Sequence, residues 1–123
     1  MLRILIADDE YLAIEAVKKI IKSNIEDVNI VATASSGKEA IIKVNELSPD
    51  IAIMDIQMPG IDGLEAIRQI KASNPNILFI VLTAYDLFDY AKESIGLGAV
   101  EYLLKPIKKD QLLMAIEKAN KIV

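Results

Sequence analysis

The feature of this sequence that most constrains its fold is an alternation of short apolar runs with amphipathic stretches, repeated five times. The apolar runs lie at residues 2–7, 29–34, 51–54, 77–82 and 100–103. Runs such as IAIM and ILFIVL are apolar at every position, as expected for parallel strands that helices cover on both faces. Right-handed crossovers between such strands predict an α/β fold, an open five-stranded parallel sheet doubly wound by five helices.

The amphipathic stretches predict five helices, each with an apolar stripe at spacings of three and four residues. In the first helix the expected stripe consists of Ala13, Ala16, Val17, Ile20 and Ile21. The spacing of Ser36 and Glu39 is that of a capping box, which predicts the start of the second helix. We expect the third helix at residues 63–72, the fourth from about residue 86 to the glycines of 96–98, and the fifth at 108–120.

Composition narrows the possible functions. With 123 residues and 53% hydrophobic content, the chain fits one compact domain over residues 1–123. A net charge of -4 argues against direct binding to nucleic acid or to an anionic membrane. Cys and His are absent, which excludes thiolate and imidazole chemistry and leaves oxygen ligands for any metal. No run is long enough to span a membrane, and MLRILIADDE does not resemble a signal peptide, so we expect a cytoplasmic protein.

Polar side chains stand at the ends of four predicted strands, namely Asp8 and Asp9, Asp55, Thr83 and Lys105. Ligands of such sheets bind at the carboxyl ends of the strands, so we expect these residues to share one edge. Carboxylates in one cleft raise one another's pKa unless a cation lies among them, which predicts a divalent metal, Mg²⁺ or else Mn²⁺. A metal, a carboxylate nucleophile, a hydroxyl and a lysine are together the groups that phosphoryl transfer requires.

Four motifs, ILIADDE, IMDIQMPGIDGLEAI, VLTAY and GAVEYLLKPI, follow one another across essentially the whole chain. In this order they resemble the receiver domains of two-component response regulators. The resemblance implies the flavodoxin-like receiver fold, with the strand order 2-1-3-4-5. It also implies that a sensor histidine kinase phosphorylates Asp55. By the same resemblance, Asp8, Asp9, Asp55 and the backbone carbonyl of Gln57 hold Mg²⁺.

The resemblance assigns further residues at the same edge. It implies that Lys105 pairs with the phosphoryl oxygens, while the Thr83 hydroxyl donates a hydrogen bond to one of them. Tyr102 matches an aromatic residue that swings inward when the threonine moves toward the phosphate. Pro106 matches a proline whose preceding peptide bond is usually cis, which aims Lys105 into the cleft.

Phosphorylation is expected to act through a change of conformation. The face formed by the fourth helix, the fifth strand and the fifth helix would then change, and control a homodimer, a partner protein or an output domain. The segment 86–112 resembles receivers attached to AraC-type transcription regulators, although Glu101 replaces their usual aspartate. We also expect Gln57 and Tyr85, which flank the path of a hydrolytic water, to tune dephosphorylation.

Other interpretations of the same residues remain open. Asp8, Asp9 and Glu10 could simply cap the first helix, whose N-terminus favours acids. A haloacid-dehalogenase-like phosphatase also uses a strand-end aspartate and Mg²⁺, but it has a second acid where this chain has Gln57. A flavodoxin-like cofactor module would need a phosphate-binding loop in place of ADDEYLA. A pseudo-receiver would bind partners without phosphorylation, and the intact set of site residues argues against it.

Overall fold

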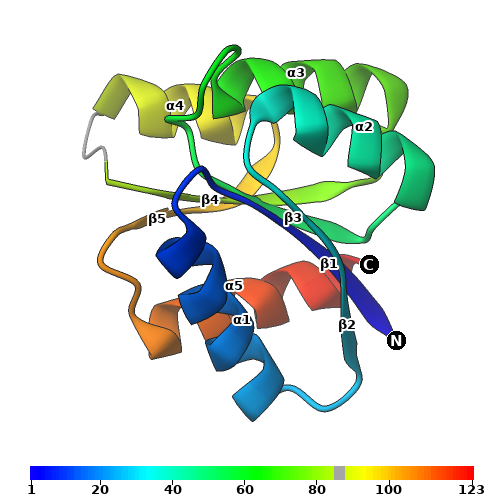
Figure 1. Cartoon of the computed structure of the whole chain (residues 1–123), viewed down its shortest axis with the longest axis vertical. Helices are drawn as coiled ribbons and strands as arrows, with labels where there is room; N and C mark the ends of the chain where they lie inside the picture. Colours follow the sequence, from blue (N-terminus) through cyan, green and yellow to red (C-terminus); the bar gives the residue numbers. More distant parts are fainter. Residues whose placement is uncertain (85–87) are drawn as a thin grey trace.

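The computed structural model describes residues 1–84 and 88–123, and in them strands and helices alternate along the chain (Figure 1). The strands are β1 (Leu2–Ala7), β2 (Val28–Ala34), β3 (Ile51–Met54), β4 (Leu78–Thr83) and β5 (Ala99–Leu104). Within this part of the chain the paired strands are parallel, and they form one sheet in the order β2-β1-β3-β4-β5. The predicted fold class and strand order are confirmed.

The helices are α1 (Tyr11–Asn24), α2 (Gly37–Leu47), α3 (Gly63–Ser73), α4 (Phe88–Gly96) and α5 (Lys109–Ile122). Each connects two neighbouring strands of the sequence, except α5, which follows the last strand. None of the helices in the described residues is both long and apolar enough to cross a membrane.

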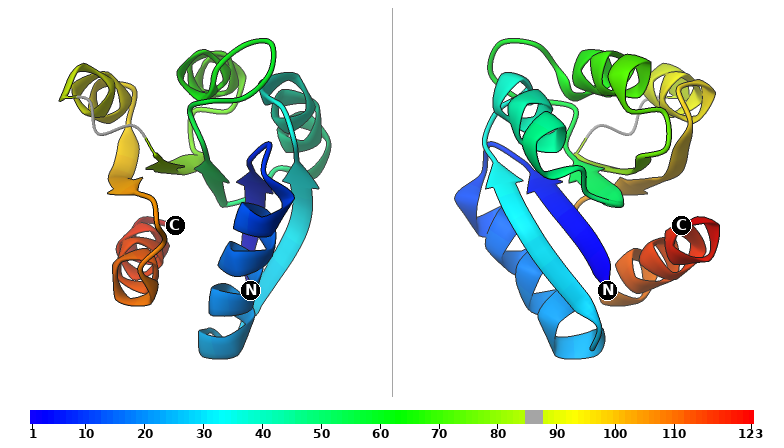
Figure 2. Two further views of the ribbon diagram at one scale, coloured as in Figure 1. Left: turned by 60° about the vertical axis from the view of Figure 1, so that its left-hand side comes forward. Right: turned by 90° about the vertical axis from the view of Figure 1, so that its right-hand side faces the viewer.

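The sheet is the middle of three layers. Helices α2, α3 and α4 cover one face, and α1 and α5 cover the other, as both views of Figure 2 show. Successive side chains of a strand point to opposite faces, so β1 places Leu5 in one apolar cluster and Ile4 and Ile6 in the other. Burial on both faces explains why the central strands are apolar at every position.

The element boundaries differ slightly from the predicted ones. Strand β2 begins at Val28, and Thr83 is the last residue of β4 rather than the first residue after it. The predicted start of the fourth helix near Asp86 lies outside the described residues. In α1 the predicted stripe is wrong in part, because Ala16 is exposed and Ile14 is buried. Ile14 lies one turn before Val17 and two turns before Ile21, on the face that packs on the sheet.

Side chains cap two of the helices, and the cap of α2 is the one that the sequence predicts. At the start of α2 the backbone N–H of Glu39 donates to Ser36 Oγ at 3.1 Å, and Ser35 N donates to Glu39 Oε1 at 3.2 Å. At the start of α3 the N–H of Glu65 donates to Asp62 Oδ1 at 2.9 Å. These bonds satisfy N–H groups that have no partner within a helix.

Candidate functional site

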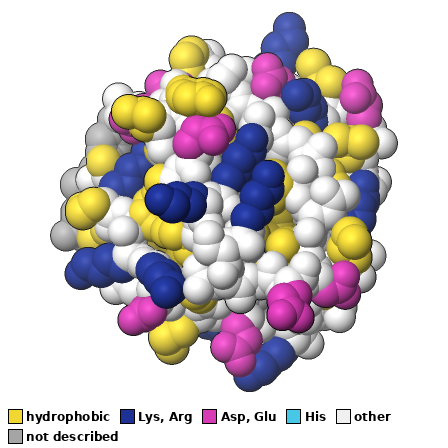
Figure 3. All heavy atoms as spheres, turned by 60° about the horizontal axis from the view of Figure 1, so that its bottom comes forward, with side chains coloured by type: hydrophobic (Ala, Val, Ile, Leu, Met, Phe, Trp, Pro, Cys, Tyr) yellow, Lys and Arg dark blue, Asp and Glu magenta, His cyan; other side chains and the backbone are white. Residues whose placement is uncertain are grey.

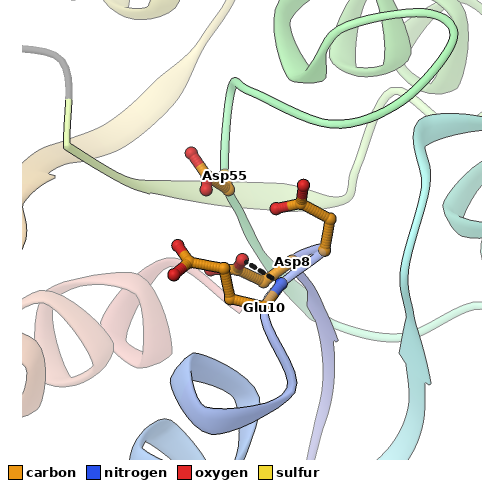
Figure 4. A group of neighbouring side chains, drawn as sticks. Asp8, Glu10 and Asp55 are labelled. Atoms are coloured by element: carbon orange, nitrogen blue, oxygen red, sulfur yellow. Dashed lines mark hydrogen bonds between the residues drawn. The ribbon is translucent and has the colours of Figure 1, made fainter.

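Asp8 and Asp55 are neighbours at the carboxyl edge of the sheet because β1 and β3 are paired. Ala7 pairs with Met54, and the backbone N–H of Asp55 donates to the Ala7 carbonyl at 3.0 Å. Both acids are buried, with exposed fractions of 4% for Asp8 and 5% for Asp55. Figure 4 shows their side chains gathered with that of Glu10 beyond the strand ends. Two buried carboxylates that are neighbours at one edge of the sheet repel each other, so they require a nearby cation.

Lys105 supplies that cation from the loop after β5. Its Nζ lies 2.9 Å from Asp8 Oδ2, 2.9 Å from Glu10 Oε1 and 3.0 Å from Asp55 Oδ2. The Lys105 backbone N–H donates to the Thr83 carbonyl at 2.8 Å, which ties this loop to the end of β4. The Lys105–Pro106 peptide bond is cis, in agreement with the resemblance.

Burial and the contacts within the cluster shift the pKa values of two groups. Burial raises the pKa of the Asp8 carboxyl, and the N–H of Glu10 and the ammonium of Lys105 offset only part of this effect. Burial by itself lowers the pKa of Lys105, but its contacts with Asp8, Glu10 and Asp55 outweigh burial and raise it. Lys105 therefore stays protonated throughout the physiological range of pH.

The same edge offers a set of ligands for a metal ion. Asp8, Asp9, Glu10 and Asp55 each present a carboxylate oxygen, and these atoms lie within 4.8 Å of one another. A set made only of oxygens fits a hard cation such as Mg²⁺ or Mn²⁺. Gln57 lies next to this set, since its backbone N–H donates to Asp55 Oδ1 at 3.2 Å. Its side chain is exposed.

The structure places the other predicted residues around the cluster. Thr83 is 1% exposed at the end of β4, where it pairs with Leu104 of β5. Tyr102 is half-buried on β5 and packs against the apolar cluster beneath α2, α3 and α4. Tyr85 lies outside the described residues. The proposed roles of Thr83, Tyr102, Gln57 and Tyr85 stay predictions.

Sequence reasoning missed the role of Glu10, which it treated only as a possible cap of α1. Glu10 does occupy the N-cap position, but its side chain makes no capping hydrogen bond. Its carboxylate instead contacts Lys105, and its backbone N–H donates to Asp8 Oδ1 at 2.9 Å. The sequence feature that could have indicated this contact is the run of three consecutive acids, because the predicted metal site included only the first two.

Comparison with protein families identifies the chain. Residues 4–117 match the model of the response regulator receiver domain, so the chain belongs to this family, whose members act in two-component systems. It is 40% identical over 121 residues to the chemotaxis protein CheY of Listeria monocytogenes, a match that covers 98% of this chain and 100% of that protein. It is 38% identical over 118 residues to the uncharacterised transcriptional regulatory protein YesN of Bacillus subtilis.

The extent of these matches differs between the relatives. The match to YesN covers 96% of this chain but 32% of YesN, so the chain spans about a third of that regulator. Among solved structures, the CheX–CheY–BeF₃–Mg²⁺ complex of Borrelia burgdorferi superposes with a TM-score of 0.91 and 28% sequence identity. That match covers 97% of this chain and 89% of the other chain. Sequence and structure therefore agree on the receiver fold.

Proposed function

We propose that residues 1–123 form one receiver domain in which Asp55 accepts a phosphoryl group from a sensor histidine kinase. The observation that carries this proposal is the 3.0 Å contact between Lys105 Nζ and the buried carboxylate of Asp55, at an edge rich in further carboxylates. A carboxylate can act as the nucleophile and form an aspartyl phosphate, which needs charge neutralisation more than a general base. The absence of histidine fits such a reaction.

Mg²⁺ is the cofactor that we propose for this transfer. Asp8, Asp9, Asp55 and the backbone carbonyl of Gln57 would hold the ion, with Mn²⁺ as a substitute. The ion would neutralise charge on the carboxylates and on the incoming phosphoryl oxygens. The set of carboxylate oxygens within 4.8 Å of one another supports this assignment, as does the presence of Mg²⁺ in the CheX–CheY complex.

Lys105 and Thr83 would bind the phosphoryl oxygens once the group is on Asp55. Charge-assisted hydrogen bonds of this kind contribute roughly 1.5 to 3 kcal/mol each. Shifting a population from 1:99 to 99:1 takes about 5.5 kcal/mol, so two or three such contacts suffice to switch the conformation. Thr83 and Tyr102 would carry the switch, and Gln57 and Tyr85 would tune the loss of the phosphoryl group.

We propose that the switch is read at the face formed by α4, β5 and α5. A groove of about 890 Å³ between β5 and α5 has both Lys105 and Tyr102 in its wall, together with Met114, which is 69% exposed. Figure 3 shows the side of the molecule that α1 and α5 cover, where Lys and Arg side chains gather beside apolar ones. A homodimer, a partner protein or an output domain, such as an AraC-type transcription regulator, would bind at the α4-β5-α5 face.

Acetyl phosphate and Mg²⁺ test the phosphoacceptor function directly. Intact mass spectrometry should show a gain of about 80 Da, expected for one phosphoryl group on a carboxylate. Asp55→Asn should abolish the gain, whereas Asp110→Asn, which changes an exposed acid on α5, should not. A wild-type protein that gains no mass would favour a pseudo-receiver. Repeated hydrolysis of phosphomonoesters would indicate that the protein is a phosphatase. A phosphoacceptor domain that is not an enzyme would show no such turnover.

A further inference from the structure

The ammonium group of Lys105 is fully engaged in this structure. A lysine has three N–H donors, and three carboxylates lie around Lys105 Nζ at 2.9, 2.9 and 3.0 Å. Those carboxylates belong to Asp8, Glu10 and Asp55. While all three contacts persist, no donor of Lys105 is left for a phosphoryl oxygen.

The three partners of Lys105 are not held equally. Asp8 and Asp55 are 4% and 5% exposed, and each accepts a further hydrogen bond from a backbone N–H two residues later, at 2.9 and 3.2 Å. The side chain of Glu10 is 66% exposed. An exposed carboxylate is solvated by water as soon as it moves away, whereas a buried one is not. Glu10 is therefore the partner that leaves most easily.

The position of Glu10 just before α1 is consistent with this. Asp, Asn, Ser and Thr at the N-cap position accept a hydrogen bond from an N–H of the first helical turn, whereas Glu is not among the residues that favour this position. Glu10 makes no such bond, and its carboxylate contacts Lys105, which lies 95 residues later in the sequence. Capping of α1 therefore does not hold the Glu10 carboxylate, whose contact is with Lys105.

We propose that Glu10 is a positioning residue, which occupies one donor of Lys105 until the phosphoryl group on Asp55 replaces it. This inference rests on the proposed phosphoacceptor function of Asp55. During transfer an Asp55 oxygen bonds to phosphorus, and the bond from phosphorus to the leaving group breaks with the electron pair going to that group. Lys105 keeps its proton and moves one hydrogen bond from the Glu10 carboxylate to a phosphoryl oxygen. Glu10 thus competes with the phosphoryl group and slows its arrival.

The variant Glu10→Gln tests this role, because it keeps the shape of the side chain and removes its charge. Glu15→Gln is the matched control, since Glu15 lies in α1 five residues after Glu10 and forms an ion pair with Lys18 at 3.6 Å. The rate constant of phosphorylation by acetyl phosphate is followed by intact mass at saturating Mg²⁺, after the Mg²⁺ affinity of each variant has been measured. Exposed ion pairs are weak, so we expect an increase of about two- to fivefold for Glu10→Gln and none for the control.

A second background separates a role through Lys105 from a general effect of charge. In Lys105→Met the substitution Glu10→Gln should no longer change the rate constant, because the donor for which Glu10 competes is missing. The inference is overturned if Glu10→Gln reacts at or below the wild-type rate at saturating Mg²⁺, or if its acceleration persists in Lys105→Met. A wild-type protein that gains no mass would instead refute the phosphoacceptor function and this role with it.

Discussion

Gly63 lies directly against the backbone of Asp55, with no room for a side chain between them. A Cβ placed on Gly63 would collide with the carbonyl oxygen of Asp55 and would lie 2.8 Å from Cα of Ile56. The N–H of Gly63 donates to the Ile56 carbonyl at 2.7 Å, which fixes this close approach. The first residue of α3 thus supports the segment that carries the proposed phosphoacceptor.

Gly63→Ala should therefore destabilise the protein and slow the proposed phosphorylation of Asp55. The clash is with backbone atoms, which cannot rotate away, so we expect a loss of roughly 1 to 3 kcal/mol in the free energy of unfolding. Urea denaturation measures this loss. The control is Gly96→Ala on α4, where a Cβ meets nothing within 4 Å. Equal stability of the two variants would contradict the close contact.

Asp8→Asn should change how the stability of the metal-free protein depends on pH. Burial raises the pKa of the Asp8 carboxyl above its ordinary value of 3.8. Between its unfolded and folded pKa values this group binds more protons in the folded protein, so its contribution to stability is lost as pH rises. The free energy of unfolding of the variant should therefore rise relative to wild type above about pH 4.

Urea unfolding of both proteins at a series of pH values without Mg²⁺ checks this relative slope. The variant Asp110→Asn, at an exposed position on α5, serves as the control and should follow the wild-type curve. A difference between Asp8→Asn and wild type that stays constant or shrinks with pH would show that burial does not dominate at Asp8.

The successes and failures of sequence reasoning at this site have different physical origins. The end of a buried strand is visible in the sequence, so Asp8 and Asp55 could be predicted to meet at one edge. The partner of Glu10 was not visible, because local capping preference favoured α1 over a contact with Lys105. The need for glycine at position 63 was equally hidden, since it depends on the path of a neighbouring backbone.

The fold shows the same division. Apolar residues on both faces of 51–54 predict a covered parallel strand, and β3 has these bounds. Thr83 was expected just beyond its strand, but it extends β4 because Leu104 pairs with it. Where a strand ends depends on its pairing partners, which lie far away in the chain. The local sequence does not show which residues these partners are. In α1, Ile14 is buried and Ala16 is exposed. The way the helix packs on the sheet decides which of its faces is buried, and the sequence of the helix alone does not contain this information.

Lys105→Met should strengthen the binding of Mg²⁺. The ammonium lies 2.9 Å from Asp8 and 3.0 Å from Asp55, so it competes with any cation for these carboxylates. Because the cluster opens to solvent at Glu10, we expect a modest gain of about 1 kcal/mol, or about fivefold in affinity. Isothermal titration calorimetry measures it. Lys118→Met, which removes an exposed lysine paired with Glu101, is the control. Weaker binding to Lys105→Met would contradict the competition.

Ser36→Ala should destabilise the fold without affecting the site chemistry. The hydroxyl of Ser36 accepts the N–H of Glu39 at the start of α2, and its loss is expected to cost about 0.5 to 2 kcal/mol. Thermal unfolding measures the effect, with Ser23→Ala on the exposed face of α1 as the control. A Ser36→Ala protein as stable as the control would mean that the cap contributes nothing.

The strand order has a consequence for the synthesis of the chain. The acids of the cluster come from the ends of β1 and β3, whereas the lysine that neutralises them follows β5, which is synthesised after the other four strands of this sheet. A nascent or truncated chain that stops before residue 105 would hold the carboxylates without their counter-charge. We therefore expect only chains that have completed β5 to be competent for the proposed phosphorylation, so that shorter chains do not react with the proposed sensor kinase.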